Sequence, residues 1–300
     1  MKIRSVFSAR KWVRFVLGTR IGKRLPDKLY IQLEYYHSLG KLLNLRNPLT
    51  YNEKLQWLKL YDRNPMYTQM VDKALAKEYV ASVIGQQYII PTYGIWENPE
   101  DINFDELPKQ FVLKVTHDSG GVIICKNIDE FDREKAIERL KRSLQREYYM
   151  VHREWPYKDI QPRIIAEEYM EDHANEELRD YKFMCFNGKV KCSFVCTDRF
   201  SDKGLHVTFF DRNWIRMPFE RHYPASEKPI AKPQCYEKMI EIAEKLTAEI
   251  PFARVDLYEI EGRIYFGEIT FYPGSGYEEF TPVEWDYKLG SWIDLKMHSE

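Results

Sequence analysis

Residues 253–276 read ARVDLYEIEGRIYFGEITFYPGSG and contain two runs in which apolar and polar side chains alternate. Such alternation is typical of half-buried strands, and Glu261-Gly262 between the runs predicts a turn. We therefore expect an antiparallel hairpin formed by residues 253–258 and 263–270. A glycine-rich turn, Pro273-Gly-Ser-Gly276, follows at the end of the second strand, and loops in such places often admit ligands.

Two carboxylates on this hairpin are candidate ligands of a metal ion. Side chains alternate along a strand, so Arg254 and Asp256 share one face. Glu268 and Thr270 likewise share one face of the partner strand. If the register brings these faces together, two carboxylates and a hydroxyl form an oxygen-rich site suited to Mg²⁺, with a cation beside it. The pattern is also compatible with a salt bridge between Arg254 and Glu268 on a solvated face.

A second hairpin is predicted upstream of the first. Residues 180–186 and 189–194 alternate on either side of Asn187-Gly188, a pair that selects a type I′ turn. With a regular two-residue turn, Lys182 is expected to face Ser193 across the two strands.

A glycine-rich loop follows a strand that carries a lysine. Residues 111–115 predict this strand, which includes Lys114, and His117-Asp-Ser-Gly-Gly121 forms the loop before a second strand at 122–125. Backbone N–H groups in such a loop can approach anionic oxygens, and the lysine adds a point charge. A plain hairpin loop fits the pattern equally well, because neither GxxxxGK[ST] nor GxGxxG occurs.

The composition is that of a folded chain. Its 300 residues carry a formal net charge of −1, and 44% of them are hydrophobic and 15% aromatic, which excludes disordered and collagen-like classes. No run approaches the length of a membrane span, and we expect no export signal. The five cysteines are odd in number and lack framework spacing, so we expect reduced, mostly buried thiols in a cytoplasmic protein.

The chain is expected to divide into four segments. A basic amphipathic tail occupies residues 1–24 and a helical region residues 25–88. An α+β lobe with the glycine-rich loop then spans 89–168, and a second α+β lobe with the metal site spans 169–300. Within the helical region, Thr50-Tyr-Asn-Glu53 is a capping box that predicts the start of a helix. A further helix is expected to contain Val71, Leu75 and Tyr79 and to end before Gly85.

The tail has the composition of a helix that lies on an anionic membrane surface. Residues 1–24 contain eight Lys and Arg residues and no Asp or Glu, interleaved with bulky apolar residues that include Trp12 and Phe15. A solvated basic arm, or a helix packed on the protein's own acidic body, is the alternative. No nucleic-acid partner is expected, because the rest of the chain is acidic and carries no nucleic-acid-binding motif.

Several blocks in this order resemble one fold family. The lysine strand with its glycine loop, the acidic stretch Ala166–Met170, Asp180-Tyr-Lys182, and Arg-x-Asp followed by Glu-x-Thr-x-x-Pro-Gly are similar to the ATP-grasp fold. More narrowly, they resemble the TupA-like ATP-grasp family of polysaccharide-associated proteins. Blocks from Asn44 to Val71-Asp-Lys73 extend the likeness to most of the chain. The resemblance implies an α+β fold in which two α+β lobes sandwich a nucleotide, preceded by a helical N-terminal region.

The resemblance also implies a nucleotide site with parts on both lobes. Lys114 would contact the phosphates of ATP. The loop over these phosphates would consist of Ser119, Gly120 and Gly121. The hinge against adenine would consist of Glu167, Glu168, Tyr169 and Met170. In this hinge, Glu167 would accept a hydrogen bond from the amino group of the base. Asp180 would lie near the ribose, and Lys182 would face the nucleotide or the substrate.

The implied chemistry is the formation of an acyl phosphate from a carboxylate and ATP, followed by attack of an amine. Asp256, Glu268 and Thr270 would hold Mg²⁺. Arg254 would stabilise the anionic transition state together with Lys114. Two departures from the wider family stand out: Thr270 replaces the usual Asn ligand, and the helical region replaces the Rossmann-like N-terminal domain that often helps to bind the acid.

These features lead to one main hypothesis and two rivals. The main one is a Mg²⁺-dependent carboxylate–amine ligase that acts on a cell-surface polysaccharide or its precursor, joining for example an amino acid to a uronic acid at the inner face of the cell membrane. Arg212, Arg216 and Arg221 are candidates for binding an anionic sugar, or form a solvated cationic loop. The first rival is a glycosyltransferase of capsular or exopolysaccharide biosynthesis, although no Asp-x-Asp motif occurs. The second is a non-catalytic nucleotide-binding module, which Thr270 favours.

Overall fold

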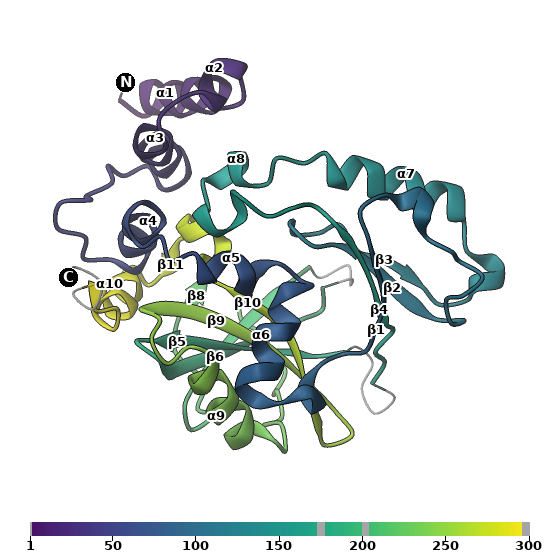
Figure 1. Ribbon diagram of the computed structural model, residues 1–300. Coiled ribbons are helices and arrows are strands. Elements are labelled where there is room, and N and C mark those ends of the chain that lie inside the picture. Colours follow the sequence, from purple (N-terminus) through teal and green to yellow (C-terminus); the bar gives the residue numbers. More distant parts are fainter. Residues whose placement is uncertain (1, 173–177, 200–203, 296–300) are drawn as a thin grey trace.

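The computed structural model describes residues 2–172, 178–199 and 204–295, with the side chains of residues 2–8 excepted. Lys2, Arg4, Val6 and Phe7 of the basic tail therefore lie outside the described side chains. Two sheet-containing lobes stand side by side, and a group of helices lies above and beside the larger one (Figure 1). The α+β class expected from the sequence is confirmed.

The smaller lobe is built on a four-stranded antiparallel sheet in the order β1-β4-β2-β3. Its strands are β1 (Thr92–Trp96), β2 (Phe111–Val115), β3 (Ile123–Cys125) and β4 (Ile164–Glu168). Helix α7 (Arg133–Leu144) contacts β2, and its Ala136 and Leu140 join the core of the lobe (Figure 1). The strand expected over 111–115 is confirmed.

The larger lobe contains a five-stranded antiparallel sheet in the order β10-β9-β5-β6-β7. These strands are β5 (Asp180–Phe186), β6 (Lys189–Thr197), β7 (His206–Asp211), β9 (Phe252–Ile260) and β10 (Arg263–Thr270). Helix α9 (Tyr236–Leu246) packs on one face, where the rings of Phe183 and Tyr236 lie 5.6 Å apart. A two-stranded sheet pairs β8 (Glu220–Arg221) with β11 (Phe280–Thr281).

Both predicted hairpins are present. Asn187 and Gly188 have φ values of 48° and 71°, the left-handed conformation that a type I′ turn requires. The predicted partner of Lys182 was wrong, however. A bulge in β6 leaves Lys191 unpaired, so Lys182 faces Phe194 instead of Ser193.

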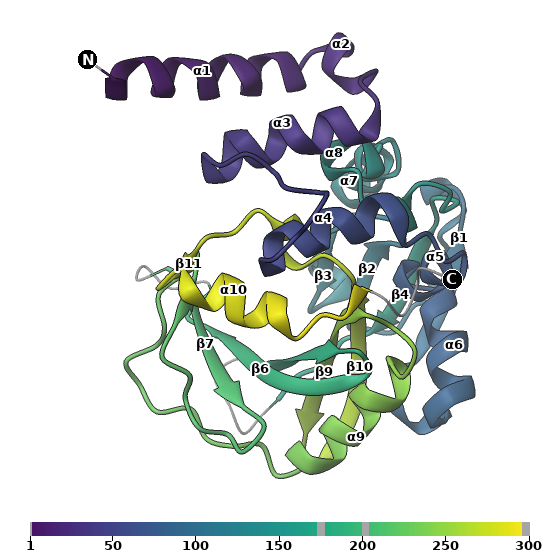
Figure 2. The ribbon, with the colours of Figure 1, turned by 90° about the vertical axis from the view of Figure 1, so that its left-hand side faces the viewer.

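Helices form the rest of the molecule, and α1, α3 and α4 lie in successive layers (Figure 2). The helices not yet named are α1 (Lys2–Leu17), α2 (Arg20–Lys23), α3 (Asp27–Leu39), α4 (Tyr51–Tyr61), α5 (Met66–Val71), α6 (Leu75–Ile84), α8 (Tyr149–His152) and α10 (Glu284–Ser291). Short 3₁₀ helices occupy Gln86–Tyr88, Pro99–Asp101, Ile128–Glu130, Trp155–Tyr157 and Pro273–Gly276. The capping box of Thr50 and Glu53 is confirmed at the start of α4.

The predicted helix across Val71 and Leu75 was wrong, because two helices meet there. Helix α5 ends at Val71, and the Asp72 carboxylate accepts hydrogen bonds from the backbone N–H groups of Ala74 and Leu75, at 2.8 and 3.0 Å. Side-chain acceptors of this kind satisfy the free N–H groups of a first turn. The break places Lys73 in a short connection between α5 and α6.

The cysteines are free thiols, and Cys125, Cys185 and Cys192 are buried on strands as expected. Within the ranges that the structure describes, no helix has the length and apolar character needed to cross a membrane.

Candidate functional site

A row of charged side chains crosses three neighbouring strands of the larger sheet. Lys182 on β5 pairs in register with Asp256 on β9, and Asp256 pairs with Glu268 on β10. Opposite partners in a sheet point to the same face, so the two carboxylates lie together. The sequence alone did not determine the register of these strands, and the structure shows that it places Asp256 and Glu268 on the same face.

A bulge at Gly267 produces this register. From the turn to Phe266, β10 pairs regularly with β9, and a continued register would place Glu268 opposite Val255, on the other face. One extra residue shifts the pairing so that Glu268 faces Asp256. A Cβ atom at position 267 would lie 3.0 Å from the carbonyl oxygen of Asp256 and 3.0 Å from the Tyr258 ring. Glycine is therefore needed for this close approach.

We predict that Gly267→Ala reduces activity more than its loss of stability explains. The added methyl group must displace β9 or β10, and overpacking of this kind costs about 1–3 kcal/mol. The displacement moves Glu268 relative to Asp256. Gly262→Ala is the matched control: its φ of 75° also disfavours alanine, but only Gln234, at 4.0 Å, lies near the new atom. Unfolding and turnover measurements on both variants separate the two effects, and equal activity per folded molecule would contradict the prediction.

Arg254 bridges the two carboxylates. Its Nε and Nη2 atoms donate to Asp256 at 2.6 and 2.8 Å, and Nη2 also donates to Glu268 Oε1 at 2.5 Å. The hydroxyl of Thr270 donates to the same oxygen at 3.1 Å. Burial raises the pKa of Glu268, but Arg254 and Lys182 outweigh it and lower the pKa to about 2. The salt bridge that was the alternative is thus present within the same carboxylate cluster.

The residues fit a divalent cation bound together with a polyanionic ligand. Asp256 is buried, whereas 48% of the Glu268 side chain is exposed and can reach a ligand from outside. Mg²⁺ is commonly held by one or two carboxylates plus substrate phosphates. Across the described ranges, no group of three or more His, Cys, Asp and Glu side chains is placed to bind a metal. The candidate protein ligands are therefore two carboxylates and the Thr270 hydroxyl, and phosphate oxygens of the bound ligand would have to supply further coordination.

A second charged group lies on the smaller lobe. The carboxylate of Glu167, on β4, binds Lys114 of β2 and Lys77 of α6, each at 2.5 Å. Only 6% of the Glu167 side chain is exposed, against 25% for Lys114. Burial raises the pKa of Glu167, but the two lysines outweigh it and lower the pKa. Glu167 therefore holds both ammonium groups in place, and its predicted contact with adenine stays a prediction.

The pairing predicts an acid-dependent loss of stability. Because the pKa of Glu167 is held below the ordinary value of a glutamate, its contribution to stability is present above that ordinary value and is lost as the pH falls through the folded-state pKa. We expect Glu167→Gln to cost roughly 3 kcal/mol at neutral pH, since one partner of a buried pair is removed. The difference from the unaltered protein should shrink below about pH 4.5. Denaturant unfolding across this range measures it, and a constant difference would contradict the assignment.

The glycine-rich loop has a fixed base and an exposed tip. Asp118 is buried and binds Arg146 at 3.2 Å, while its backbone oxygen accepts a hydrogen bond from Lys73. Ser119 and Gly120 are exposed, and Gly120 has a φ of 95° with nothing near the position of a Cβ atom. The tip is therefore open to a ligand.

Lys73 lies between the charges of the two lobes. Burial lowers the pKa of Lys73, while Glu268 on β10 and Asp118 in the loop act in the opposite direction; Lys114 lowers it further. Lys73 in turn contributes to the low pKa of Glu268. Charges of both lobes also act on Tyr258 of β9. Burial raises the pKa of Tyr258, and the rise is increased by Asp180, Asp256 and Glu268 of the larger lobe and by Glu167 of the smaller one. The metal-site candidates and the lysine strand thus share one electrostatic environment.

Sequence reasoning gave no role to Lys73 or Lys77. Lys73 stood in the block Val71-Asp-Lys73 that supported the family resemblance, and this was the signal that could have drawn attention to it. Lys77 carried no such signal, because its position one turn into α6 suggests only a surface lysine.

The remaining candidates are distributed around these groups. Asp180 begins β5 and binds Lys182 at 2.5 Å. Glu168 ends β4, and its N–H donates to Pro91 O at 3.0 Å. Tyr169 and Met170 continue from it in an irregular segment, which suits a hinge. Gly121 lies at the end of the glycine loop, where a Cβ atom would meet the Asp118 carboxylate at 2.9 Å.

The three arginines suggested for an anionic sugar do not share partners. Arg212 binds Glu244 of α9, whereas buried Arg221 binds Glu278 at 2.8 Å and lies over the rings of Phe194 and Phe209. The backbone of Arg216 pairs with that of Phe210 in an isolated antiparallel β-bridge.

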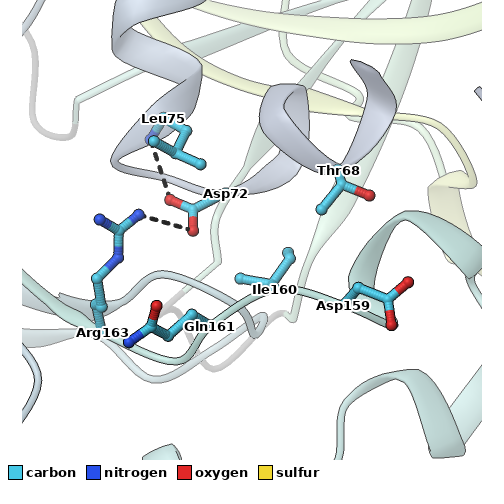
Figure 3. A pocket seen from close by; sticks show the side chains of 7 residues that line it. All are labelled: Thr68, Asp72, Leu75, Asp159, Ile160, Gln161 and Arg163. Carbon is cyan, nitrogen blue, oxygen red and sulfur yellow. Dashed lines mark hydrogen bonds and ion pairs between the residues drawn. The ribbon is translucent and has the colours of Figure 1, made fainter. Parts of the chain in front are cut away.

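A separate hollow of about 240 Å³ lies beside α5 and α6 (Figure 3). Arg163 points across it to Asp72, at 3.2 Å. Its lining residues are Thr68, Asp72, Leu75, Asp159, Ile160, Gln161 and Arg163. None of the site residues expected from the sequence is among them.

The arrangement of lysine strand, glycine loop and paired carboxylates agrees with the sequence comparison. The model of the family described as TupA-like ATPgrasp matches residues 53–294. The chain belongs to the TupA-like ATP-grasp family. Its ATP-grasp fold is therefore established, and the resemblance seen in the sequence is confirmed at the level of the family. No functionally curated protein matches the chain.

Solved structures that resemble this ATP-grasp chain do so distantly. The ATP complex of D-alanine–D-alanine ligase from Bacillus anthracis is 17% identical, with a TM-score of 0.42 over 67% of this chain and 55% of that one. The Helicobacter pylori D-alanine–D-alanine ligase is 15% identical, with a TM-score of 0.43 over 81% of this chain and 69% of that one. The ADP complex of PurK, N5-carboxyaminoimidazole ribonucleotide synthetase, is 16% identical, with a TM-score of 0.40 over 73% of this chain and 50% of that one. The chain thus spans little more than half of the B. anthracis enzyme.

Proposed function

We propose that the protein is an ATP- and Mg²⁺-dependent ligase that joins a carboxylate to an amine through an acyl phosphate. The observation that carries the proposal is the row formed by Lys182, Asp256 and Glu268, in which Glu268 acts on the same lysine, Lys73, as Lys114 and Glu167 of the smaller lobe do. A carboxylate pair suited to a metal and a lysine group suited to phosphates are what a metal-bound triphosphate needs.

The lysines would bind the phosphates of ATP. Lys114 lies on β2, the strand before the glycine loop, where Glu167 keeps it oriented, and Lys73 binds the backbone oxygen of Asp118 in the loop. The backbone N–H groups of Ser119, Gly120 and Gly121 would close over the phosphate oxygens. Nucleotide binding would bring negative charge to lysines that are now partly buried, and each charge-assisted contact gains from the low dielectric.

The carboxylates would hold Mg²⁺ through Asp256 and Glu268, with the Thr270 hydroxyl as a third oxygen. The bound ion would neutralise charge on the transferred phosphoryl group. Arg254 shares an oxygen of Glu268 with Thr270, so its guanidinium lies beside the candidate metal ligands. It would donate to the transferred phosphoryl group.

The reaction that fits this site has two steps. A carboxylate oxygen of the acid attacks the terminal phosphorus of ATP, and ADP leaves. The amine nitrogen then attacks the acyl carbon, inorganic phosphate leaves, and the amine loses a proton. No protein nucleophile takes part in either step. Positioning and charge stabilisation by Lys73, Lys114 and Arg254 would supply the catalysis.

The substrate class proposed is an anionic sugar, such as a uronic acid of a cell-surface polysaccharide or its precursor, joined to an amino acid. The likeness to polysaccharide-associated proteins supports this class. Such a substrate would be met at the inner face of the cell membrane. Among the three arginines, Arg221 is proposed to bind its carboxylate, because the buried Nη1 of Arg221 has no hydrogen-bond partner, while Nε binds Glu278 at 2.8 Å.

Release of ADP tests the activity. The protein, ATP and Mg²⁺ are incubated with mixtures of uronic acids and amino acids, and ADP and phosphate are measured. Thermal unfolding with ATP, ADP, GTP or sugar nucleotides, each with and without Mg²⁺, tests binding; a ligand at a hundred times its Kd stabilises by about 2.7 kcal/mol. Stabilisation by a sugar nucleotide alone would favour the glycosyltransferase. Stabilisation by ATP with no ADP from any mixture would favour the binding module.

A further inference from the structure

The N-terminal helices present an outer apolar face to solvent. Trp12 and Phe15 of α1 are 65% and 66% exposed, and Val16 beside them is 36% exposed. Positions i, i+3 and i+4 lie on one side of a helix, and the Trp12 and Phe15 rings are in edge contact at 6.0 Å. We call Trp12, Phe15 and Val16 the outer apolar face. Ile21 of α2, 73% exposed, adds to this apolar surface.

The opposite side of α1 is fixed to the body. Arg10 donates from Nε to His37 O at 2.7 Å and from Nη2 to Ser38 O at 2.9 Å, both at the end of α3. Leu17 is buried beside it. Figure 2 shows α1 lying along α3, on the outside of the helical layers. The helix is therefore held by its inner side, and the outer apolar face has no cover among the residues that the structure describes.

The charge around this face has a single sign. Residues 1–24 contain eight cations and no anion. Arg14 on α1 and Arg20 on α2 are exposed, as is Arg24 just after α2. A helix with apolar side chains on one side and a surplus of Lys and Arg around them is suited to the interface of an anionic bilayer, where the apolar side enters the headgroup region. In a dimer formed through this face, the cations of the two copies would repel each other, so the charge favours an anionic partner over a second copy of the chain.

We propose that the outer apolar face binds the surface of an anionic lipid bilayer. The Trp12 and Phe15 side chains enter the interface between headgroups and acyl chains, which aromatic side chains prefer. Arg20 and Arg24, on either side of exposed Ile21 in the sequence, lie at the level of the lipid phosphates, where each cation contributes roughly a fivefold gain in partitioning. This inference goes beyond the proposed ligase and does not depend on it.

The contact would also orient the nucleotide site. Lys23, at the end of α2, binds Glu147 at 3.2 Å, and its backbone oxygen accepts a hydrogen bond from Arg153 at 2.7 Å. One residue before Glu147, Arg146 binds Asp118 of the glycine loop. The segment 146–153 thus joins the membrane-facing helices to the base of the loop. A chain bound through α1 would hold the candidate nucleotide site at a fixed position relative to the lipid.

Vesicle co-sedimentation of the full chain tests the proposal. We expect binding to mixed phosphatidylcholine–phosphatidylglycerol vesicles, weakened by added salt, and much weaker binding to pure phosphatidylcholine. Trp12→Ser/Phe15→Ser should weaken binding to the mixed vesicles at least about 30-fold, because two buried aromatic side chains are lost. Arg20→Gln/Arg24→Gln should weaken it about 30-fold on the mixed vesicles and leave the weak binding to phosphatidylcholine unchanged.

Ile215→Ser/Tyr287→Ser is the matched control, because both side chains are exposed apolar groups of the larger lobe, at 64% and 51%. It should bind vesicles as the unaltered chain does. Circular dichroism and thermal unfolding show whether each variant is folded. Failure of the unaltered chain to bind the mixed vesicles would overturn the proposal, as would equal binding by all variants. Dimerisation in sedimentation velocity that Trp12→Ser/Phe15→Ser abolishes, without vesicle binding, would assign the face to a second copy. None of these results bears on ADP release, which tests the ligase separately.

Discussion

Replacing Glu268 with Gln is expected to reduce ADP release by about a thousandfold, since several kcal/mol of charge stabilisation depend on the metal. Glu268 is the more exposed of the two candidate ligands and accepts from Arg254 and Thr270 at one oxygen. Glutamine keeps the size of the side chain and one acceptor oxygen but removes the charge. Turnover measured against Mg²⁺ concentration should show a lower maximum and a higher concentration at half-maximum.

The fold should survive this change. Arg254 retains both hydrogen bonds to Asp256, at 2.6 and 2.8 Å, so its guanidinium is not left without a partner. Glu237→Gln is the matched control: Glu237 binds Lys232 at 2.7 Å and lies on α9, which packs against the sheet. This variant should keep full turnover. Full turnover of Glu268→Gln, with a normal response to Mg²⁺, would remove Glu268 from the metal site.

Local sequence signals accounted for most of the strands and for their turns. Asn187-Gly188 gave the correct turn because both residues tolerate positive φ, and the alternation around it is a property of the chain itself. The start of α4 was predictable for the same reason, since Thr50 and Glu53 satisfy each other's N–H groups within one turn. Such interactions need no knowledge of distant residues.

The two bulges were not predictable from these local signals. Lys191 and Gly267 each insert one residue into an otherwise regular ladder. A bulge depends on what the neighbouring strand packs against, so alternation along one strand does not reveal it. The consequence differs between them: the bulge at Lys191 changed the partner of Lys182, whereas the bulge at Gly267 created the pairing of Asp256 with Glu268. The candidate metal site thus depends on an interruption, at Gly267, of the strict alternation of side chains along β10.

Long-range pairing was the second feature that local signals did not reveal. The family resemblance assigned Glu167 to the hinge, which stays a prediction, but nothing near it in the sequence indicated that its carboxylate binds Lys114 and Lys77, which come from other elements. Asp72 interrupts a helical pattern because it caps the next helix and also binds Arg163, more than ninety residues away. Hydrophobic periodicity carries no information about such polar contacts.

Lys73 shows what this long-range pairing adds to the function. The connection between α5 and α6 places its ammonium group on the backbone oxygen of Asp118, at the base of the glycine loop. Burying an ammonium group is costly, and one neutral carbonyl compensates for only part of that cost. Both the lowered pKa of Lys73 and its proximity to Glu268 and Lys114 indicate a cation kept for an anionic ligand.

We therefore predict that Lys73→Met lowers kcat/KM for ATP roughly a hundredfold, the loss of one charge-assisted contact to phosphate in the transition state. Methionine is unbranched and fills the space of the lysine stem, so the free energy of unfolding should stay the same or rise. Lys54→Met is the matched control, because Lys54 also donates to a backbone oxygen, that of Ile293 at 2.7 Å, and burial lowers its pKa too. It should leave kcat/KM unchanged. If Lys73→Met instead lost stability and kept its kcat/KM per folded molecule, Lys73 would be a structural residue, and the link between the two lobes would not serve nucleotide binding.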